Sequence, residues 1–243
     1  MATVKEHYDN LLGSCYTWMF GDHQAKVDKA EAFFAARDIR PLRSGLALDL
    51  GSGPGYSALA LARLGFQVTA VDFCRTLLDE LAEHAAGLPV TAVEADFVDY
   101  LTSPPGPIEV CVCMGDTLPH LESRERVTDC IERVYRVLAP KGLFVITYRD
   151  LSFELQGPAR FIPVRSDENI ILTCFLEFED DRVMVHDLLH TRSGNQWALK
   201  KSSYPKLRLQ FDFLVEELEL QGFILEECQS TGGMITIVAV KGA

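Results

Sequence analysis

The sequence predicts an α/β protein: a doubly wound, seven-stranded, mostly parallel sheet whose last strand is antiparallel, with an antiparallel β insertion before the final helix. From about residue 45 to residue 150, short β-branched runs alternate with helical segments, which is typical of parallel strands joined by right-handed crossovers. After Arg149 the alternation is replaced by strand-like runs joined by short turns, which indicates an antiparallel meander. The last two strand-like runs are separated only by residues 231–233, so we expect them to be antiparallel neighbours.

Five strands and the helices between them make up the parallel part. The strands are expected at residues 45–50, 67–71, 89–93, 108–113 and 143–148, and the helices at residues 57–64, 76–86 and 123–138. Gly65 and Gly87 follow the first two helices, as helix C-termini favour. A further helix is expected before the first strand, at residues 24–37, where Val27, Ala30 and Phe34 form one apolar stripe.

The rest of the chain is expected to contain a meander, one helix and two strands. The meander runs are residues 169–179, 182–192 and 197–204, the helix is residues 211–220, and the strands are residues 223–228 and 234–240. The two final strands bring the predicted sheet to seven.

Length and composition are those of an ordinary globular domain. At 243 residues the chain can bury one substantial core, and 48% hydrophobic and 24% charged residues are usual values. No apolar run approaches the roughly 20 residues of a membrane span, and the N-terminus lacks the apolar region of a signal peptide. We therefore expect a cytoplasmic protein that does not bind a membrane.

The charge balance makes nucleic acid an unfavourable partner. The net charge is −12, and binding a polyanion would need a dense basic patch against that field. The one modest basic cluster consists of Lys200, Lys201, Lys206 and Arg208. It is interpreted as a solvated hairpin face and the turn after it, because exposed lysines are common without any function.

Cysteines and histidines predict neither disulfides nor a metal site. The seven cysteines are scattered without a Cys-x-x-Cys pair, and Cys111 and Cys113 project to the same face of one strand, where they pack as small hydrophobes. His186 and His190 share one face of the meander but have no third ligand nearby in sequence. A bound metal is therefore not expected.

A glycine-rich turn after the first strand is the most informative local motif. Asp49 lies near the end of the apolar run, and Tyr56 begins the next helix. Between them lie Gly51, Gly53 and Gly55. Glycines tolerate positive φ and let a ligand lie directly against the backbone. In the dinucleotide fingerprint the third glycine follows the second by three residues, and here Tyr56 occupies that position.

This spacing, with Asp49 just before it, resembles the first motif of class I S-adenosylmethionine-dependent methyltransferases. The family's later motifs are resembled in order by Asp72, by Asp96 and Phe97, by Met114 and Gly115, and by residues 137–143. The resemblance implies that family's seven-stranded fold and S-adenosylmethionine as cofactor. It also implies cofactor contacts from Tyr16, Asp49, Gly51, Gly53, Gly55, Asp72, Phe73, Asp96, Phe97, Met114 and Gly115.

Two of the acids have second interpretations. The resemblance makes Asp72 the ribose-binding acid, yet the same acid would suit NAD or cap the helix that follows it. It makes Asp96 the acceptor from the adenine amino group, whereas the alternative is a cap on the turn at residues 98–100.

The electrostatics favour S-adenosylmethionine over a dinucleotide. This cofactor carries a sulfonium cation, an ammonium and a carboxylate, but no phosphate. Asp49, Asp72, Asp96 and Asp116 at the rim of the predicted site suit that charge pattern and would repel a pyrophosphate.

Three residues at the same edge of the sheet are candidates for catalysis. Methyl transfer is an in-line displacement, and it needs a base only when the nucleophile must lose a proton. The candidates are His120, Tyr148 and Arg149. His120 either acts as a base or organises its loop, and Arg149 either pairs with Asp150 or holds a substrate carboxylate.

The domain organisation follows from the same resemblance. Residues 1–40 resemble a helical lid, in which Tyr16 either closes over the methionine moiety of the cofactor or packs on the core. Residues 41–156 and 206–243 are the expected core. The insertion at residues 157–205 is expected to cover the substrate or to form a dimer surface.

The leading hypothesis is a methyltransferase that moves a methyl group from S-adenosylmethionine to an oxygen or nitrogen of a small molecule. The protein would act alone or as a homodimer. An NAD-dependent oxidoreductase is the rival enzyme class. A cofactor-binding partner or sensor without turnover is the third possibility.

Overall fold

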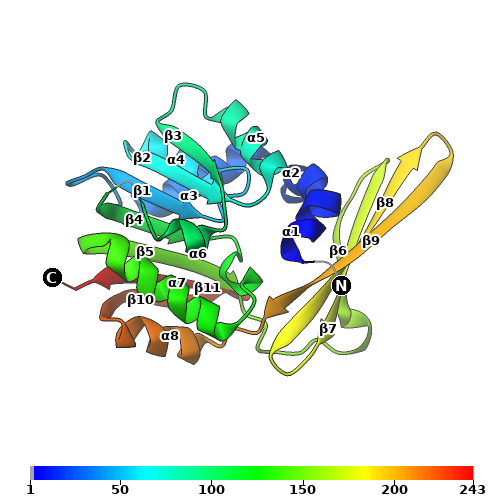
Figure 1. Ribbon diagram of the computed structural model, residues 1–243. Coiled ribbons are helices and arrows are strands. Elements are labelled where there is room, and N and C mark those ends of the chain that lie inside the picture. Colours follow the sequence, from blue (N-terminus) through cyan, green and yellow to red (C-terminus); the bar gives the residue numbers. More distant parts are fainter. Residues whose placement is uncertain (1–2, 105, 243) are drawn as a thin grey trace.

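The computed structural model describes residues 3–104 and 106–242, which form two separate sheets (Figure 1). The large sheet consists of β1 (Leu46–Leu50), β2 (Gln67–Asp72), β3 (Val90–Glu94), β4 (Ile108–Cys113), β5 (Leu138–Arg149), β10 (Phe223–Thr231) and β11 (Met234–Lys241). Its spatial order is β3-β2-β1-β4-β5-β11-β10. Neighbours from β3 to β5 are parallel, and β11 is antiparallel to both β5 and β10. The predicted doubly wound sheet is confirmed.

Helices cover both faces of the large sheet (Figure 1). One face is covered by α3 (His23–Ala35), α4 (Tyr56–Arg63) and α5 (Arg75–His84), and the other by α6 (Phe97–Tyr100), α7 (Arg124–Val137) and α8 (Phe211–Leu220). In α7, Val127, Ile131 and Val134 recur at helical spacing and are fully buried. Each contributes roughly 1.5–3 kcal/mol through burial of its side chain.

The strand β5 begins five residues before its predicted start. Leu138 pairs with Ile108, and the register shifts before Val110 meets Leu143. Lys141 has a φ of 61° inside this irregular segment, and a Cβ on Gly142 would lie 2.9 Å from the Ala139 carbonyl oxygen. The Pro-Lys-Gly sequence therefore forms a distortion within the strand rather than a turn before it.

The small sheet is antiparallel, with β6 (Phe161–Ser166), β7 (Ile170–Phe178), β8 (Arg182–Ser193) and β9 (Gln196–Leu207) in that spatial order. Three of these strands were expected, and β6 was not. It contains Pro163, which argues against a strand in sequence but is tolerated at a sheet edge, where its missing N–H is not needed.

Arg208 holds together the two chain segments that connect the small sheet to the large one. Its guanidinium donates to the carbonyl oxygens of Leu151, Ser152 and Glu179 at 3.2, 2.9 and 2.8 Å. Its backbone N–H donates to the Asp181 carbonyl oxygen at 2.9 Å. The expectation that this basic cluster is a solvated face is thus only partly correct. Lys200 and Lys201 are exposed, but Arg208 donates to backbone carbonyl oxygens and Lys206 pairs with Asp116.

The N-terminal residues 3–20 lie between the two sheets (Figure 1). This segment comprises α1 (Val4–His7), a π-helical turn (Tyr8–Leu12), a 3₁₀ turn (Gly13–Cys15) and α2 (Tyr16–Phe20). Buried His7 contacts Asp187 of β8, with 3.0 Å between Nε2 and Oδ2. By contrast α3, also part of the expected lid, packs on α4 through Val27 and Phe34 and belongs to the core.

Other expectations concern cysteines and membrane spans. The seven cysteines all lie within the described residues, and none forms a disulfide. Cys111 and Cys113 are fully buried in the core, as the sequence predicted. Across residues 3–104 and 106–242, no helix combines the length and apolar character that crossing a bilayer requires.

Candidate active site

A narrow cleft lies at the carboxyl ends of β1, β2 and β4, where the strand order of the sheet reverses. Ligands of doubly wound sheets bind at this position. The cleft is lined by Tyr8, Tyr16, Gly51, Gly53, Asp72, Phe73, Leu77, Phe97, Gly115, Thr117 and His120. Neither lysine nor arginine is among these lining residues, so the cleft offers no side-chain cation for a phosphate.

The glycines of the turn after β1 serve two purposes: one allows close packing against a neighbouring side chain, and another leaves the backbone accessible from the cleft. Gly51 and Gly53 have positive φ, 67° and 53°. A Cβ on Gly51 would lie 2.2 Å from Cγ2 of Thr117, so that glycine is required for packing. A Cβ on Gly53 would meet nothing closer than a Tyr16 ring carbon at 3.8 Å. Gly53 therefore leaves its backbone open toward the cleft, whereas Gly55, with a φ of 90°, begins α4 behind it.

Asp72 fixes the turn and also lines the cleft. Its Oδ2 accepts from the Gly53 N–H and its Oδ1 from the Cys74 N–H, both at 2.8 Å. Burial raises the pKa of Asp72, while these backbone donors oppose the rise. Each carboxylate oxygen has a second lone pair available to ligand hydroxyls. The bond to Cys74 precedes the first helical residue, Arg75, and α5 has no side-chain cap hydrogen bond, so Asp72 does not cap that helix.

Asp49 lies beneath the turn rather than at the rim. It is 2% exposed and is not among the cleft-lining residues. Burial, together with the charge of Asp72, raises the pKa of Asp49 to about 7. Its Oδ2 is buried without a hydrogen-bond partner among the described residues.

Two other residues predicted to contact the cofactor, Asp96 and Met114, are not among those that line the cleft. Asp96 caps α6 through the Asp99 N–H at 3.0 Å and pairs with Arg126 at 3.1 Å, so the capping alternative is realised and Phe97 lines the cleft instead. Met114 packs in the core. Gly115 after it is exposed at the cleft, and no atom lies within 4 Å of the position of its Cβ.

On the opposite side Tyr8, Tyr16 and His120 line the cleft, and Tyr204 packs against Tyr8 and His120 without lining it. Tyr8, from the N-terminal segment, lies with its ring centroid 6.0 Å from that of Tyr16 and 5.8 Å from that of His120. Tyr204 of β9 contacts His120 edge-on at 5.5 Å. This set of Tyr8, Tyr16, His120 and Tyr204 is called the aromatic wall below.

His120 is the imidazole of this wall. Burial, with the nearby Lys206 ammonium, lowers the pKa of His120 well below its usual value. Its Nε2 is buried and has no hydrogen-bond partner in the described part of the chain. Lys206 is itself paired with Asp116 at 2.5 Å, and Asp116 accepts from the Arg149 N–H at 2.9 Å. The ion pair joins the small sheet to the loop after β4.

A family model described as "Methyltransferase domain" matches residues 47–142, which carry β1 to β4 and most of the cleft. This part of the chain is a class I S-adenosylmethionine-dependent methyltransferase domain.

Curated relatives match somewhat more than half of the chain. A cypemycin N-terminal methyltransferase of Streptomyces sp is 32% identical over 55% of this chain and 56% of its own length. A putative methyltransferase, YqeM, of Bacillus subtilis is 28% identical over 59% of each chain. The chain thus spans a little over half the length of these relatives.

Solved structures match almost the whole fold. The CcbJ methyltransferase from Streptomyces caelestis superposes with a TM-score of 0.79 at 20% identity, covering 98% of this chain and 99% of that one. The sugar N-methyltransferase KedS8 from a Streptoalloteichus species has a TM-score of 0.74 at 14% identity, covering 97% and 94%. The arrangement of both sheets is therefore shared with other methyltransferases.

Two candidates for catalysis lie outside the cleft of the methyltransferase domain. Tyr148 is fully buried in the core cluster that also contains Leu207 and Leu214, and burial raises its pKa further above the ordinary value. Arg149 is exposed, and no ion pair joins it to Asp150, although both residues are described. The predicted base at Tyr148 is therefore incompatible with this geometry.

Three cleft residues were missed from the sequence: Tyr8, Leu77 and Thr117. Tyr8 lies in the same N-terminal segment as Tyr16, and the π-helical turn that it begins had no sequence signal. Thr117 follows the motif at Met114 and Gly115, and its hydroxyl donates to the Met114 carbonyl oxygen at 2.8 Å. Its position just after a recognised motif was the one sequence signal that could have indicated that it lines the cleft.

Proposed function

We propose that this chain transfers a methyl group from S-adenosylmethionine to a nitrogen or oxygen of a small-molecule acceptor. The observation that carries the proposal is the cleft itself, with the glycine turn and Asp72 on one side and the aromatic wall on the other. The first side belongs to the methyltransferase domain. The second side is built largely from parts of the chain outside it.

The donor side fits S-adenosylmethionine. Gly53 and Gly115 offer open backbone, Asp72 offers two carboxylate oxygens to ribose hydroxyls, and the lining residues carry no lysine or arginine that would suit a pyrophosphate. When bound, the cofactor supplies a methyl group already activated by its sulfonium. These residues hold and orient it, and the aromatic wall excludes water.

The acceptor side favours nitrogen. His120 is neutral and its Nε2 has no described partner, so it can take a proton. Because its pKa is depressed, it is a weak base and poorly matched to an alcohol. A neutral amine carries its own lone pair and needs no base before it attacks. We therefore place small-molecule amines ahead of hydroxyl acceptors.

Calorimetry followed by an acceptor screen tests the proposal. S-adenosylmethionine and its demethylated product should bind with one-to-one stoichiometry, and NAD should not. Labelled methyl transfer should then be measured on matched panels of small amines, phenols and alcohols. Binding of NAD alone would overturn the donor assignment. Tight binding of S-adenosylmethionine with no transfer to any panel member would favour a cofactor-binding partner protein.

Two wider expectations stay part of the proposal. A cytoplasmic location is supported by the seven free thiols, which are typical of a reducing compartment. A homodimer is best tested at the outer face of the small sheet, where Phe161, Trp197 and Leu199 expose apolar surface. Light scattering of the protein and of a Trp197→Ser variant measures this directly.

A further inference from the structure

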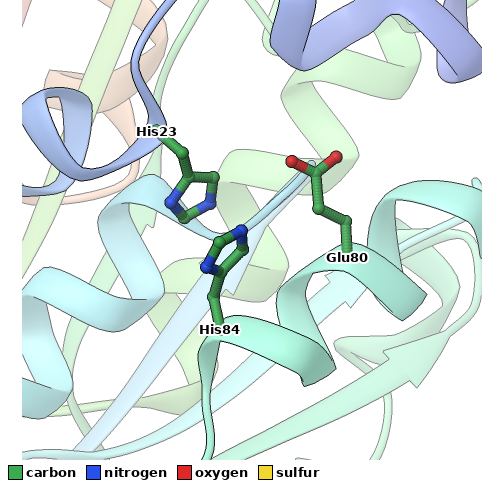
Figure 2. A group of neighbouring side chains, drawn as sticks. All are labelled: His23, Glu80 and His84. Atoms are coloured by element: carbon green, nitrogen blue, oxygen red, sulfur yellow. The ribbon is translucent and has the colours of Figure 1, made fainter.

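Three side chains that the sequence did not bring together lie near the outer end of the glycine turn. His23 is the first residue of α3, and Glu80 and His84 lie one helical turn apart on α5 (Figure 2). One ligand atom from each lies within 4.8 Å of the other two. The group consists of two imidazoles and one carboxylate, drawn from two helices that are 40 or more residues apart in the chain.

His23 is prepared for ligation by its backbone partner. Its Nε2 lies 3.0 Å from the carbonyl oxygen of Pro54, so Nε2 carries the proton and Nδ1 keeps its lone pair. A histidine that donates one ring N–H to a backbone carbonyl and presents the other nitrogen is the usual arrangement of a metal ligand.

Glu80 and His84 supply the other two ligand atoms of the proposed metal site. The Thr17 hydroxyl donates to Glu80 at 2.5 Å, which orients the carboxylate. The rings of His23 and His84 are stacked, with centroids 3.8 Å apart and planes 15° apart. The nitrogen lone pairs lie in these ring planes, so those of the two rings lie in nearly parallel planes. His84 is exposed and is the last residue of α5 (Figure 2).

We propose that His23, Glu80 and His84 bind a divalent first-row transition ion such as Zn²⁺, and that the ion ties α3 to α5 beside the glycine turn. Two imidazoles and a carboxylate suit this class of ion, and a water molecule completes a tetrahedral shell. Hard ions such as Mg²⁺ prefer oxygen ligands and are disfavoured. Thr17 and Pro54 act as outer partners, so the site joins the N-terminal segment, α3, the glycine turn and α5.

The test is titration of metal-free protein with Zn²⁺ and with Co²⁺, whose visible absorption reports its coordination. Wild-type protein should bind one ion. His84→Ala, at an exposed site, and Glu80→Gln, which keeps an oxygen to accept from Thr17, should each weaken binding by at least the order of 10–100-fold typical of outer partners. His186→Ala is the matched control, because His186 also lies beside a carboxylate, Glu177, at 3.2 Å.

The outcomes separate a metal site from a merely structural cluster. Retained binding in His186→Ala together with the loss in His84→Ala and Glu80→Gln supports the site. Absence of saturable one-to-one binding, or equal affinity in wild type and His84→Ala, overturns it. Hydrogen exchange gives a second measurement: the ion should slow exchange in residues 16–35 of wild type but not of Glu80→Gln, and unchanged exchange in wild type contradicts the proposed tie.

Discussion

The large sheet and the small sheet contribute to the cleft in different ways: loops of the large sheet line it, whereas the small sheet supports it from behind, through Tyr204 packed against Tyr8 and His120. The donor side is made by strand ends within residues 47–142, where turns a few residues long place Gly53, Asp72 and Gly115. The acceptor side depends on contacts between distant segments, such as Tyr204 of β9 against His120. If the proposed function holds, cofactor binding is built into local backbone geometry, whereas acceptor choice depends on how separate parts of the chain pack.

The largest expected effect concerns the backbone of the donor side. Gly51→Ala should lower the free energy of unfolding by about 3 kcal/mol, because its Cβ would overlap Thr117 and its φ is 67°. A Cβ in Gly53→Ala meets only ordinary van der Waals contacts, the nearest at 3.8 Å, so this variant should cost only about 1–2 kcal/mol from its positive φ. Urea unfolding measures both. Equal losses would mean that packing against Thr117 does not constrain the turn.

Next in size is the loss of cofactor affinity at Asp72. Asp72→Ala should weaken S-adenosylmethionine binding by about 1.5–3 kcal/mol, since it removes charged hydrogen bonds and frees the Gly53 N–H. Asp96→Ala is a matched control, because Asp96 also follows a strand but caps α6. That control should cost about 1 kcal/mol of stability and leave affinity unchanged in calorimetry. A similar drop in affinity for both variants would restore Asp96 to the cofactor site.

A smaller effect is expected from the buried charge of Asp49. Its pKa is about 7 in the fold against an ordinary 3.8, so its ionised form is disfavoured by folding. Folding therefore takes up a proton between these values, and the destabilisation is complete above pH 7 and fades as the pH falls toward 4. Asp49→Asn should raise the free energy of unfolding by roughly 2 kcal/mol at pH 8 and by little near pH 4. A pH-independent difference would contradict this assignment.

The smallest effect tests the acceptor side. Tyr204→Leu removes the ring that packs edge-on against His120, and kcat/KM for the acceptor should fall by up to about tenfold. Affinity for S-adenosylmethionine should stay within about twofold, because the donor side is untouched. Tyr135→Leu, at a tyrosine packed on Phe223, controls for general destabilisation. A parallel loss of cofactor affinity in Tyr204→Leu would erase the distinction between the two sides.

The sequence predicted the donor turn well because its determinants are local. Positive φ at Gly51 and Gly53 and the position of Asp72 follow from residues adjacent in the chain. The sequence could not predict which way a side chain points when both faces of its strand are buried. The strand β5 lacks a regular polar alternation, so nothing in the sequence showed that Tyr148 points into the core.

Other features depend on segments far apart in the chain. The aromatic wall joins Tyr8 to Tyr204, and the three-residue cluster joins His23 to His84. No short sequence motif predicts contacts between residues so far apart in the chain. Only the spacing of Glu80 and His84 on one helix was visible in sequence.

Arg208 has a consequence for how such enzymes diversify. One guanidinium binds the backbone of Leu151, Ser152 and Glu179 and so closes the base of the small sheet, where the chain leaves β5 and later enters α8. Entry and exit of the inserted segment thus lie at one point of the fold. A recombination event that exchanges everything between them would replace the small sheet as one unit, which under the proposed function changes the acceptor specificity and leaves the cofactor side intact.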